Sequence, residues 1–347
     1  MNRDHNHKGL FRRAAAVCLV GAILITSALY GLSGCDAPEP PDPASDGVLR
    51  VVVTSFPAEE FARAVLGDLL NGSGGEPVVL ERLGKTGQDL HAFEPSAADI
   101  RKLSGADILI CIGSFAETWL DGAIRASGNR TLRVLSMTDV CELHEEEELP
   151  GLGEHDHHHD HGHGEGTQVE YDEHVWTSFG NMARIVTAVR DTLTAALPEQ
   201  AATLQANAAS YLLELDALHA DYQATVASAT DPVLVIADRY PFAYLMRELG
   251  VVCYAAFPGC SSETQASFST QVMLTETVRD LHLPAVLYVD FGVASVADAV
   301  SRATGVPVRR LWSGQVASDT GLSYLDMLRE NLVSLRAALG ERVEGCP

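Results

Sequence analysis

The sequence predicts an α/β protein: two lobes with parallel sheets, joined by a long central helix, with a ligand site in the cleft between them. Short β-branched stretches alternate with stretches of helical spacing before residue 178 and again after residue 230. Such alternation is typical of parallel sheets that are covered by helices. In two lobes of this kind, the loops at the carboxyl ends of the strands face each other across a cleft, where ligands bind.

The first half contains a regular series of strand and helix patterns. The predicted strands are 48–54, 77–80, 107–112 and 132–135, and the predicted helices are 56–70 and 96–103. Ser96 precedes the second helix, and Asp99 lies three positions further on. We expect both to cap this helix, because their side chains can pair with backbone N–H groups that lack partners in the first turn.

A long helical stretch, residues 178–228, connects the two halves. Proline is tolerated in the first turn of a helix, so Pro198 predicts two helices, the second reaching about Ala229. At 1.5 Å per residue the second measures on the order of 50 Å, enough for a spine between two lobes. The second half repeats the alternation, with strands at 233–238, 251–254, 285–290 and 308–311 and helices at 242–246, 267–281, 295–304 and 324–339.

The composition excludes one class of function and favours another. The chain has 347 residues, with 24 Lys and Arg against 47 Asp and Glu, and a net charge of -23. A sequence-independent nucleic-acid binder needs basic residues that neutralise phosphates, so that class is excluded. The excess of acidic residues favours a cationic substrate over an anionic one.

The N-terminus resembles a bacterial lipoprotein signal. Residues 1–13 carry four basic side chains, an uncharged apolar run follows, and Leu-Ser-Gly ends it just before Cys35. A basic segment followed by an apolar run is the pattern of a signal peptide. The small residues before Cys35 resemble a lipobox, in which the cysteine thiol is diacylated. We expect Cys35 to anchor the protein to the outer face of the cytoplasmic membrane; the alternative is an uncleaved membrane anchor.

These patterns divide the chain into five segments. They are the signal peptide 1–34, the lipidated Cys and Pro-rich tether 35–47, the N-terminal lobe 48–196 with a loop at 142–170, the linking helix 197–230, and the C-terminal lobe 231–345. Five cysteines follow the lipid site, namely Cys111, Cys141, Cys253, Cys260 and Cys346. Disulfides are permitted outside the cytoplasm, but their pairing stays open, and an odd count leaves one thiol unpaired within the chain.

The loop at 142–170 is rich in histidine and acidic residues and has no apolar periodicity. Its histidines are His144, His155, His157, His158, His159, His161 and His163. Such a composition cannot form a core, so we expect a mobile loop. Imidazole and carboxylate suit Zn²⁺, Ni²⁺ and Cu²⁺, and we expect the loop to bind several metal ions weakly. The alternative is a solvated acidic loop without a metal.

Two further histidines lie on either side of this loop. His91 occurs in the sequence Asp-Leu-His-Ala-Phe-Glu-Pro, and His174 occurs in Asp-Glu-His-Val-Trp. Neighbouring acids can orient an imidazole by accepting its second N–H, as metal sites require. A packed or surface position is the alternative role of each histidine.

These two stretches resemble the signatures of a known family. The first is similar to the His-x-aromatic-Glu-Pro signature of the cluster A-I proteins, the zinc- and manganese-binding proteins of ABC importers. The second is similar to their Asp-Pro-His-Val-Trp signature, with Glu173 in place of Pro. The resemblance covers roughly residues 48–340. It implies that the metal site lies in the cleft between the lobes and that His91 and His174 are ligands from the N-terminal lobe.

The sequence departs from this family at the third ligand. The family pattern is His or Glu followed by x-x-Phe-x-Tyr, whereas this chain has Arg239 in the ligand position. A guanidinium has no lone pair for a metal, so Arg239 is excluded. We expect Asp238 to substitute, with an ion pair to Arg239 or a helix cap as its alternative role. Asp290 at a strand end and Glu263 in a loop are further candidates.

The resemblance implies an extracytoplasmic substrate-binding protein, and not an enzyme, that captures Zn²⁺ and delivers it to the permease and ATPase of an ABC importer. Two histidines and a carboxylate suit Zn²⁺ and also Mn²⁺. The His-rich loop favours zinc; manganese or iron is the alternative. A secreted zinc hydrolase is disfavoured because no His-Glu-x-x-His helix occurs. A surface lipoprotein that buffers metal or mediates adhesion is the other alternative. We expect a monomer.

Overall fold

The computed structural model describes residues 47–72, 78–84, 93–113, 116–146, 149, 171–259, 266–290, 292 and 294–340. The predicted signal peptide, Cys35, His91 and Glu263 lie outside the described residues. So do Cys260, Cys346 and the histidines at 155, 157, 158, 159, 161 and 163.

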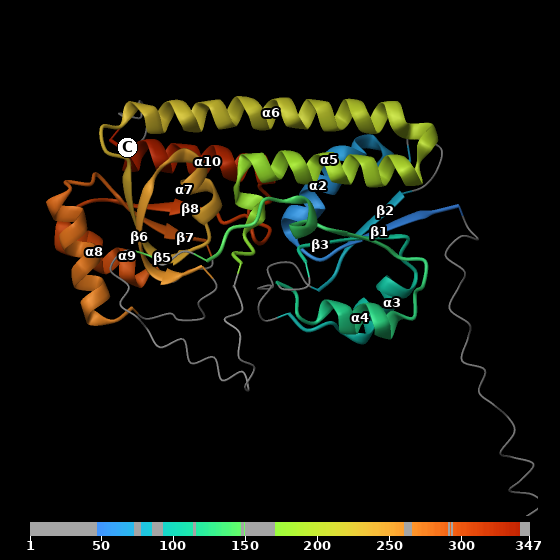
Figure 1. The fold of residues 1–347 in the computed structure, drawn as a ribbon. Coiled ribbons are helices and arrows are strands. Elements are labelled where there is room, and N and C mark those ends of the chain that lie inside the picture. The colour runs from blue at the N-terminus through green and yellow to red at the C-terminus, as the bar shows by residue number, and fades with distance from the viewer. Residues whose placement is uncertain are drawn as a thin grey trace, which may run out of the picture. The chain divides into compact units, whose positions relative to one another are not determined.

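The N-terminal lobe is built on a parallel four-stranded sheet (Figure 1). Its elements are β1 (Leu49–Val53), α2 (Phe56–Leu66), η1 (Gly67–Asn71), β2 (Val78–Arg82), α3 (Ala97–Ser104), β3 (Ile108–Cys111), α4 (Leu120–Ser127), β4 (Arg133–Ser136) and η3 (Thr138–Val140). The strand order is β2-β1-β3-β4. Val51 of β1 lies opposite Leu80 on one side and Ile108 on the other, which sets the register of the three strands.

The C-terminal lobe repeats this architecture. Its elements are β5 (Val233–Tyr240), α7 (Ala243–Leu249), β6 (Val252–Pro258), α8 (Phe268–Asp280), β7 (Val286–Val289), α9 (Ser295–Thr304), β8 (Val308–Leu311) and α10 (Tyr324–Ala338). The strands are again parallel, in the order β6-β5-β7-β8. The predicted fold class, two α/β lobes with parallel sheets, is therefore confirmed.

Two helices connect the lobes, as the sequence predicts. The 3₁₀ helix η4 (Val175–Thr177) leads into α5 (Phe179–Ala196), and the short turn η5 (Pro198–Gln200) leads into α6 (Ala201–Ser228). With 28 residues, α6 is about 42 Å long at 1.5 Å per residue. It packs against α2 and α5 of the first lobe and against α7 and α10 of the second (Figure 1). This is the predicted central helix.

Both faces of each sheet are covered, which explains why the central strands read as continuous apolar runs. In β1, Val51 and Val53 point into the large core that α2, α5 and α6 share, while Val52 points into a smaller core under α3 and α4. In β5, Leu234 and Ile236 point into the large core and Val235 into a core under α8 and α9. The side chains alternate because successive residues of a strand face opposite sides.

The structure also differs locally from the prediction. Helix α4 was not predicted: it has only eight residues, contains Gly122 and begins without a side-chain cap, so it carries few sequence signals. The predicted helix 56–70 ends as an α-helix at Leu66, because Gly67 takes a positive φ of 51° and the chain continues as η1. The predicted cap of α3 is confirmed, since Ser96 and Asp99 form a reciprocal capping box.

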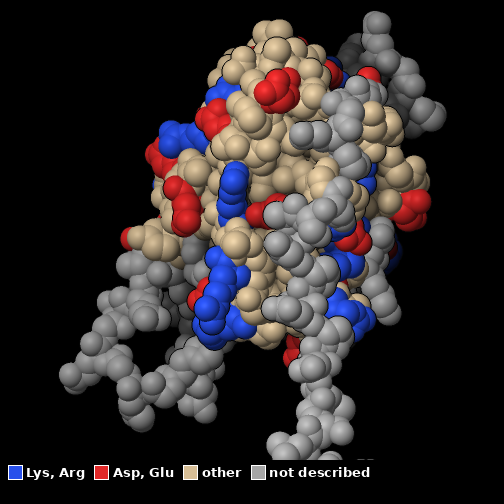
Figure 2. All heavy atoms as spheres, turned by 90° about the vertical axis from the view of Figure 1, so that its right-hand side faces the viewer, with Lys and Arg blue, Asp and Glu red and all other residues tan. Residues whose placement is uncertain are grey.

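Charged side chains of the N-terminal lobe pair with one another at the surface. Figure 2 shows Lys and Arg side chains close to Asp and Glu side chains over the face that it displays. Glu59 accounts for two such contacts, to Arg63 at 2.7 Å and to Arg82 at 3.3 Å. In the described part of the chain, none of the helices has the length and apolar character needed to cross a membrane.

Candidate metal site

His174 lies directly before η4 and is buried, with 1% of its surface exposed. One oxygen of Asp172, Oδ1, lies 2.7 Å from His174 Nδ1 and also 2.7 Å from the His174 backbone nitrogen. A carboxylate can only accept, so Nδ1 carries the proton and Nε2 is left as the nitrogen that can bind a metal. This is the orienting contact with a neighbouring acid that the sequence suggested.

The protonation of His174 is set by burial and by nearby acids. Burial by itself lowers the pKa of His174, but the charge and hydrogen bond of Asp172 and the charges of Glu173 and Glu146 outweigh it, so the pKa lies above the usual value. In the protonated imidazole Nε2 also carries a proton, and a metal ion must displace this second proton to bind. The acids that orient the imidazole therefore also attract the cation that replaces the proton.

The two ends of the His-rich segment are tied to each other and to the C-terminal lobe. Glu145 and Tyr171 form an isolated antiparallel bridge, and the Asp172 N–H donates to the His144 carbonyl at 3.0 Å. The Tyr244 hydroxyl of α7 donates to the Asp172 carbonyl at 2.7 Å and accepts from the His144 N–H at 3.1 Å. Asp172 is thus shared between the base of the His-rich segment and His174.

His144, predicted as a loop ligand, is placed against the C-terminal lobe. Its ring lies 5.2 Å from that of Tyr244, and its Nδ1 accepts from the Arg247 guanidinium at 3.3 Å. Glu248, next in α7, caps the start of α5 by accepting from the N–H groups of Phe179 and Gly180 at 2.9 and 3.2 Å. A pocket of about 230 Å³ lies among these side chains. Its wall holds two arginines, Arg184 and Arg247, and two glutamates, Glu142 and Glu248, so the charges of the wall offset one another.

Asp238 lies at an irregularity of β5, where the pairing with β6 shifts between Ile236 and Arg239. Its Oδ1 accepts from the Arg239 N–H at 2.8 Å and its Oδ2 from the Val289 N–H at 3.2 Å. Burial raises the pKa of Asp238, and these hydrogen bonds oppose the rise. A Cβ at Gly292 would collide with the carboxylate. Both oxygens thus bind backbone: Oδ1 within β5, and Oδ2 across to β7, where the ladder has one paired position, Ile236 with Leu287.

Asp290 follows β7 and is 7% exposed. Its Oδ1 accepts from the Ser313 N–H at 2.5 Å. Its Oδ2 is buried and has no hydrogen-bond partner among the residues that the structure describes. Burial raises the pKa of Asp290 to about 6, although hydrogen bonds from Ser313 and the charges of Arg310 and Arg239 lower it. A buried acceptor without a partner is costly unless something binds it, so Asp290 suits a metal ligand better than Asp238.

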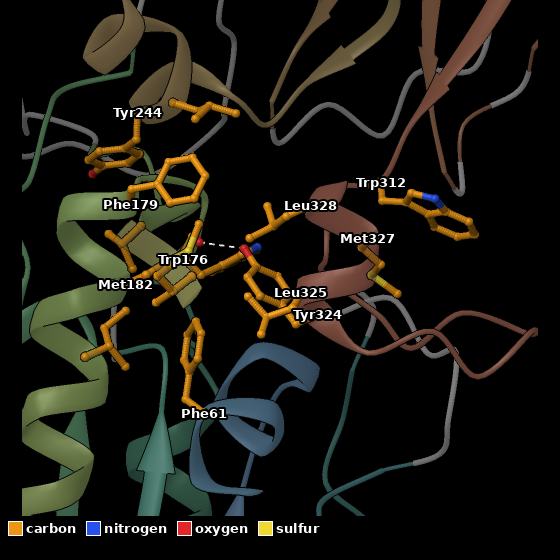
Figure 3. Close-up of a cluster of buried hydrophobic side chains, with 14 of the residues drawn as sticks. Phe61, Trp176, Phe179, Met182, Tyr244, Trp312, Tyr324, Leu325, Met327 and Leu328 are labelled. Atoms are coloured by element: carbon orange, nitrogen blue, oxygen red, sulfur yellow. Dashed lines mark hydrogen bonds between the residues drawn. The ribbon is translucent and has the colours of Figure 1, made fainter. Parts of the chain in front are cut away.

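Ser313 connects Asp290 to the segment that carries His174. The Trp176 indole N–H donates to the Ser313 carbonyl at 3.1 Å, and the Ser313 N–H donates to Asp290. The Trp176 carbonyl in turn accepts from the Tyr324 hydroxyl at 2.6 Å. Figure 3 shows Trp176 beside Phe61 and Tyr324 in the core that both lobes share.

The C-terminal lobe also contacts the His174 ring through the backbone at Gly259. A Cβ there would lie 2.9 Å from the Tyr240 carbonyl oxygen and 3.3 Å from His174 Cε1. Gly259 lies directly after β6, so the end of this strand packs against the imidazole. Only a residue without a side chain permits this approach.

The Gly259→Ala variant is expected to bind Zn²⁺ about 10-fold more weakly, because the added methyl group pushes the His174 ring from its place. The matched control is Gly122→Ala, where a Cβ meets nothing within 4 Å. Isothermal titration calorimetry measures both affinities. Equal affinity of Gly259→Ala and its parent would contradict the role of the Gly259 contact in holding the His174 ring.

Of the four predicted ligands, the described residues include His174, Asp238 and Asp290, and His91 lies outside them. Within the described ranges, no three His, Cys, Asp or Glu side chains are grouped so that they could hold a metal ion. The structure joins His174 and Asp290 through Trp176 and Ser313, and it gives Asp238 a role in the backbone. Sequence reasoning missed Trp176 and Ser313; the only signal was the Trp that ends the second signature.

Comparisons with known proteins agree on one family. The family model described as "ZnuA: Zinc-uptake complex component A periplasmic" matches residues 51–338. The zinc-binding lipoprotein AdcA of Streptococcus pneumoniae serotype 4 is 29% identical over 299 residues, which cover 84% of this chain and 56% of AdcA. This chain therefore spans just over half the length of that relative. The manganese-binding lipoprotein MntA of Halalkalibacterium halodurans is 25% identical over 338 residues, covering 94% of this chain and 99% of MntA.

A solved structure shares the fold. A mutant of the laminin-binding adhesin Lmb of Streptococcus agalactiae superposes with a TM-score of 0.68 at 20% identity. The match covers 84% of this chain and 99% of Lmb. At this identity the likeness extends to the two-lobed fold and no further.

Proposed function

This chain belongs to the ZnuA family of periplasmic zinc-uptake components, and from that membership we propose that it is the extracytoplasmic substrate-binding protein of a metal ABC importer. It captures Zn²⁺ between its two lobes and delivers the ion to a membrane permease that an ATPase drives. Like other members of the family, it is a transport component and not an enzyme. We further propose that residues 1–34 are removed and that Cys35 carries the lipid anchor.

The observation that carries this proposal is the buried His174, whose Nδ1–H is held by Asp172. This is the arrangement in which a neutral imidazole presents Nε2 to a metal ion. We propose that His91 and His174 are the ligands from the N-terminal lobe and that Asp290 supplies a carboxylate oxygen from the other lobe. Asp238 then supports the site by holding β5 to β7, while Arg239 supplies no ligand.

Zinc is the cargo that the donors favour. Two imidazoles and one carboxylate form a small ligand set, which suits the low coordination number of Zn²⁺. Mn²⁺ prefers a larger number of oxygen ligands. The relative named as zinc-binding supports this choice, and the relative named as manganese-binding keeps Mn²⁺ as the alternative. Both His174 and Asp290 must lose a proton to bind, so protons compete with Zn²⁺ as the pH falls.

Uptake of radioactive zinc by cells tests the proposal. A strain that lacks this gene is expected to take up little zinc from chelator-treated medium, and a plasmid copy of the parent is expected to restore uptake. His174→Ala should fail to restore it, while His282→Asn, an exposed position after α8, should succeed. Equal uptake with and without the gene would contradict the proposed function.

Deletion of residues 150–170 tests the role of the His-rich loop. This deletion keeps Leu149, which is buried in the shared core, and leaves four residues between Glu145 and Tyr171, so that their bridge and the Tyr244 contacts can form and His174 should stay in place. We expect the variant to lose the weak zinc equivalents and to keep one tight equivalent with its affinity within about 3-fold, since that site has its own ligands. Calorimetric titration of parent and variant measures both. Loss of the tight equivalent would place the main site in the loop.

A further inference from the structure

We propose that Trp176, acting through Ser313, is a positioning residue that fixes the distance between His174 and Asp290 and thereby the preference of the cleft for Zn²⁺. The inference rests on the proposed function and deepens it. Trp176 is not itself a proposed ligand. It contacts one proposed ligand with its ring and holds the peptide that binds the other.

Trp176 reaches from the His174 segment into the C-terminal lobe. Its side chain is fully buried, and its ring lies edge-on to the His174 imidazole with the centroids 5.2 Å apart and an angle of 60° between the planes. Its indole N–H donates to the Ser313 carbonyl, 137 residues away in the sequence. A buried N–H that is paired in this way resists displacement, because breaking the bond leaves both groups unsatisfied.

Ser313 passes this constraint to Asp290 through its own peptide groups. Its carbonyl accepts from Trp176, and its N–H donates to Asp290 Oδ1 at 2.5 Å. Any shift of the Ser313 backbone therefore moves the carboxylate. Since Oδ1 is held on this side, Oδ2 is the oxygen that remains for a metal ion.

The residues on either side of Ser313 are fixed as well. The Trp312 N–H donates to the Asn331 side-chain oxygen at 2.6 Å, and the Asn331 amide donates back to the Trp312 carbonyl at 2.8 Å. Gly314 has a φ of 67°, and a Cβ there would collide with the Tyr324 ring. Ser313 thus lies between two anchored neighbours, and the Trp176 bond sets its position relative to the other lobe.

Tyr324 fixes the opposite end of this connection. Its hydroxyl donates to the Trp176 carbonyl, and its backbone N–H donates to Glu60 of α2 at 2.9 Å. The ring packs edge-on against Phe61 at 5.4 Å (Figure 3). Trp176 is therefore held by its carbonyl as well as by its indole. This restricts changes in the distance between His174 and Asp290.

A fixed spacing favours the metal whose bond lengths it matches. Zn²⁺ binds imidazole and carboxylate at about 2.0–2.2 Å in a tetrahedral shell, whereas Mn²⁺ suits sites with more oxygen ligands. Loosening the spacing should cost Zn²⁺ more affinity than Mn²⁺. The expected effect of losing the indole N–H is a drop of about 10-fold in Zn²⁺ affinity, typical of groups that orient metal ligands, and a smaller drop for Mn²⁺.

The test uses the soluble part of the chain, residues 36–347, with Trp176→Phe, which removes the indole N–H together with part of the ring. The matched control is Tyr222→Phe, which removes a buried hydroxyl that donates to the Leu328 carbonyl of α10 at 2.6 Å, away from the proposed ligands. Affinities for Zn²⁺ and Mn²⁺ are measured by chelator competition, and the absorption spectrum of the complex with one equivalent of Co²⁺ reports the ligand geometry. Thermal unfolding reports whether each variant folds.

We expect Trp176→Phe to weaken Zn²⁺ binding, to lower the ratio of Zn²⁺ to Mn²⁺ affinity and to change the Co²⁺ spectrum, with Tyr222→Phe unchanged in all three. If Trp176→Phe does not fold, benzothienylalanine at position 176 keeps the ring shape and removes only the N–H. Parental affinities and an unchanged Co²⁺ spectrum in the folded variant would overturn the inference. A parent protein without a tight zinc site would instead overturn the proposed function.

Discussion

Replacing His174 with alanine is expected to lower the affinity of the cleft for Zn²⁺ by about 100-fold or more, beyond the effect of losing an orienting group. The imidazole is buried, and Asp172 fixes its tautomer so that Nε2 can bind the ion. Without it, the acids around the site remain and attract cations, but no nitrogen ligand is left on this segment. Isothermal titration calorimetry with Zn²⁺ gives the affinity of parent and variant.

The control for this variant is His282→Asn. His282 is exposed and has a positive φ of 51°, which asparagine also tolerates, so the fold should be unaffected. His282→Asn is expected to bind Zn²⁺ like the parent. Retention of the tight site in His174→Ala would show that the buried histidine has a structural role only.

Asp290→Asn and Asp238→Asn are expected to act in opposite ways. Asp290→Asn should lower Zn²⁺ affinity by about 10- to 100-fold, because it removes the charge from the carboxylate whose Oδ2 lacks a partner among the described residues. Asp238→Asn should leave affinity within a few fold and lower the free energy of unfolding by about 1–3 kcal/mol. In the Asp238→Asn variant, the side-chain amide N–H would face the backbone N–H of either Val289 or Arg239. Both of these groups now donate hydrogen bonds to the carboxylate.

Calorimetric zinc titration and urea unfolding separate these two effects. Asp290→Asn replaces a carboxylate whose pKa is raised to about 6, so it should not be the less stable variant of the pair at pH 7. Lost zinc affinity with unchanged stability in Asp238→Asn would make Asp238 a ligand, and parental affinity in Asp290→Asn would exclude Asp290.

Local sequence patterns predicted most of the fold. The central strands β1, β3 and β5 are short apolar runs with both faces buried, and the helix caps follow rules that involve three or four neighbouring residues, as at Ser96. Helix α4 lacks such local patterns and was not predicted. It has eight residues, contains a glycine and begins without a side-chain cap, so it depends on packing against α3. The spacing of apolar residues over 56–70 fits an α-helix throughout, so it could not reveal that the chain continues as a 3₁₀ helix from Gly67.

The candidate site could be predicted only in part. The motif around His174 identified the histidine and an orienting acid, because these residues are neighbours in the sequence. The ranking of Asp238 above Asp290 rested on its place beside the usual ligand position, and no local pattern tells which carboxylate already binds backbone N–H groups. The link from Trp176 to Ser313 joins residues 137 positions apart, so only the fold brings it about.

We propose that one tight zinc site lies in the cleft although Arg239 occupies the usual ligand position. Chelator competition on residues 36–347 with 150–170 deleted, using Zn²⁺ and Mn²⁺ in separate titrations, measures this site without the His-rich loop. One tight equivalent of Zn²⁺ and weaker binding of Mn²⁺ are expected. Preference for Mn²⁺ would change the cargo and keep the importer. Absence of a tight site for either metal would contradict the account, leaving the His-rich loop as the metal binder.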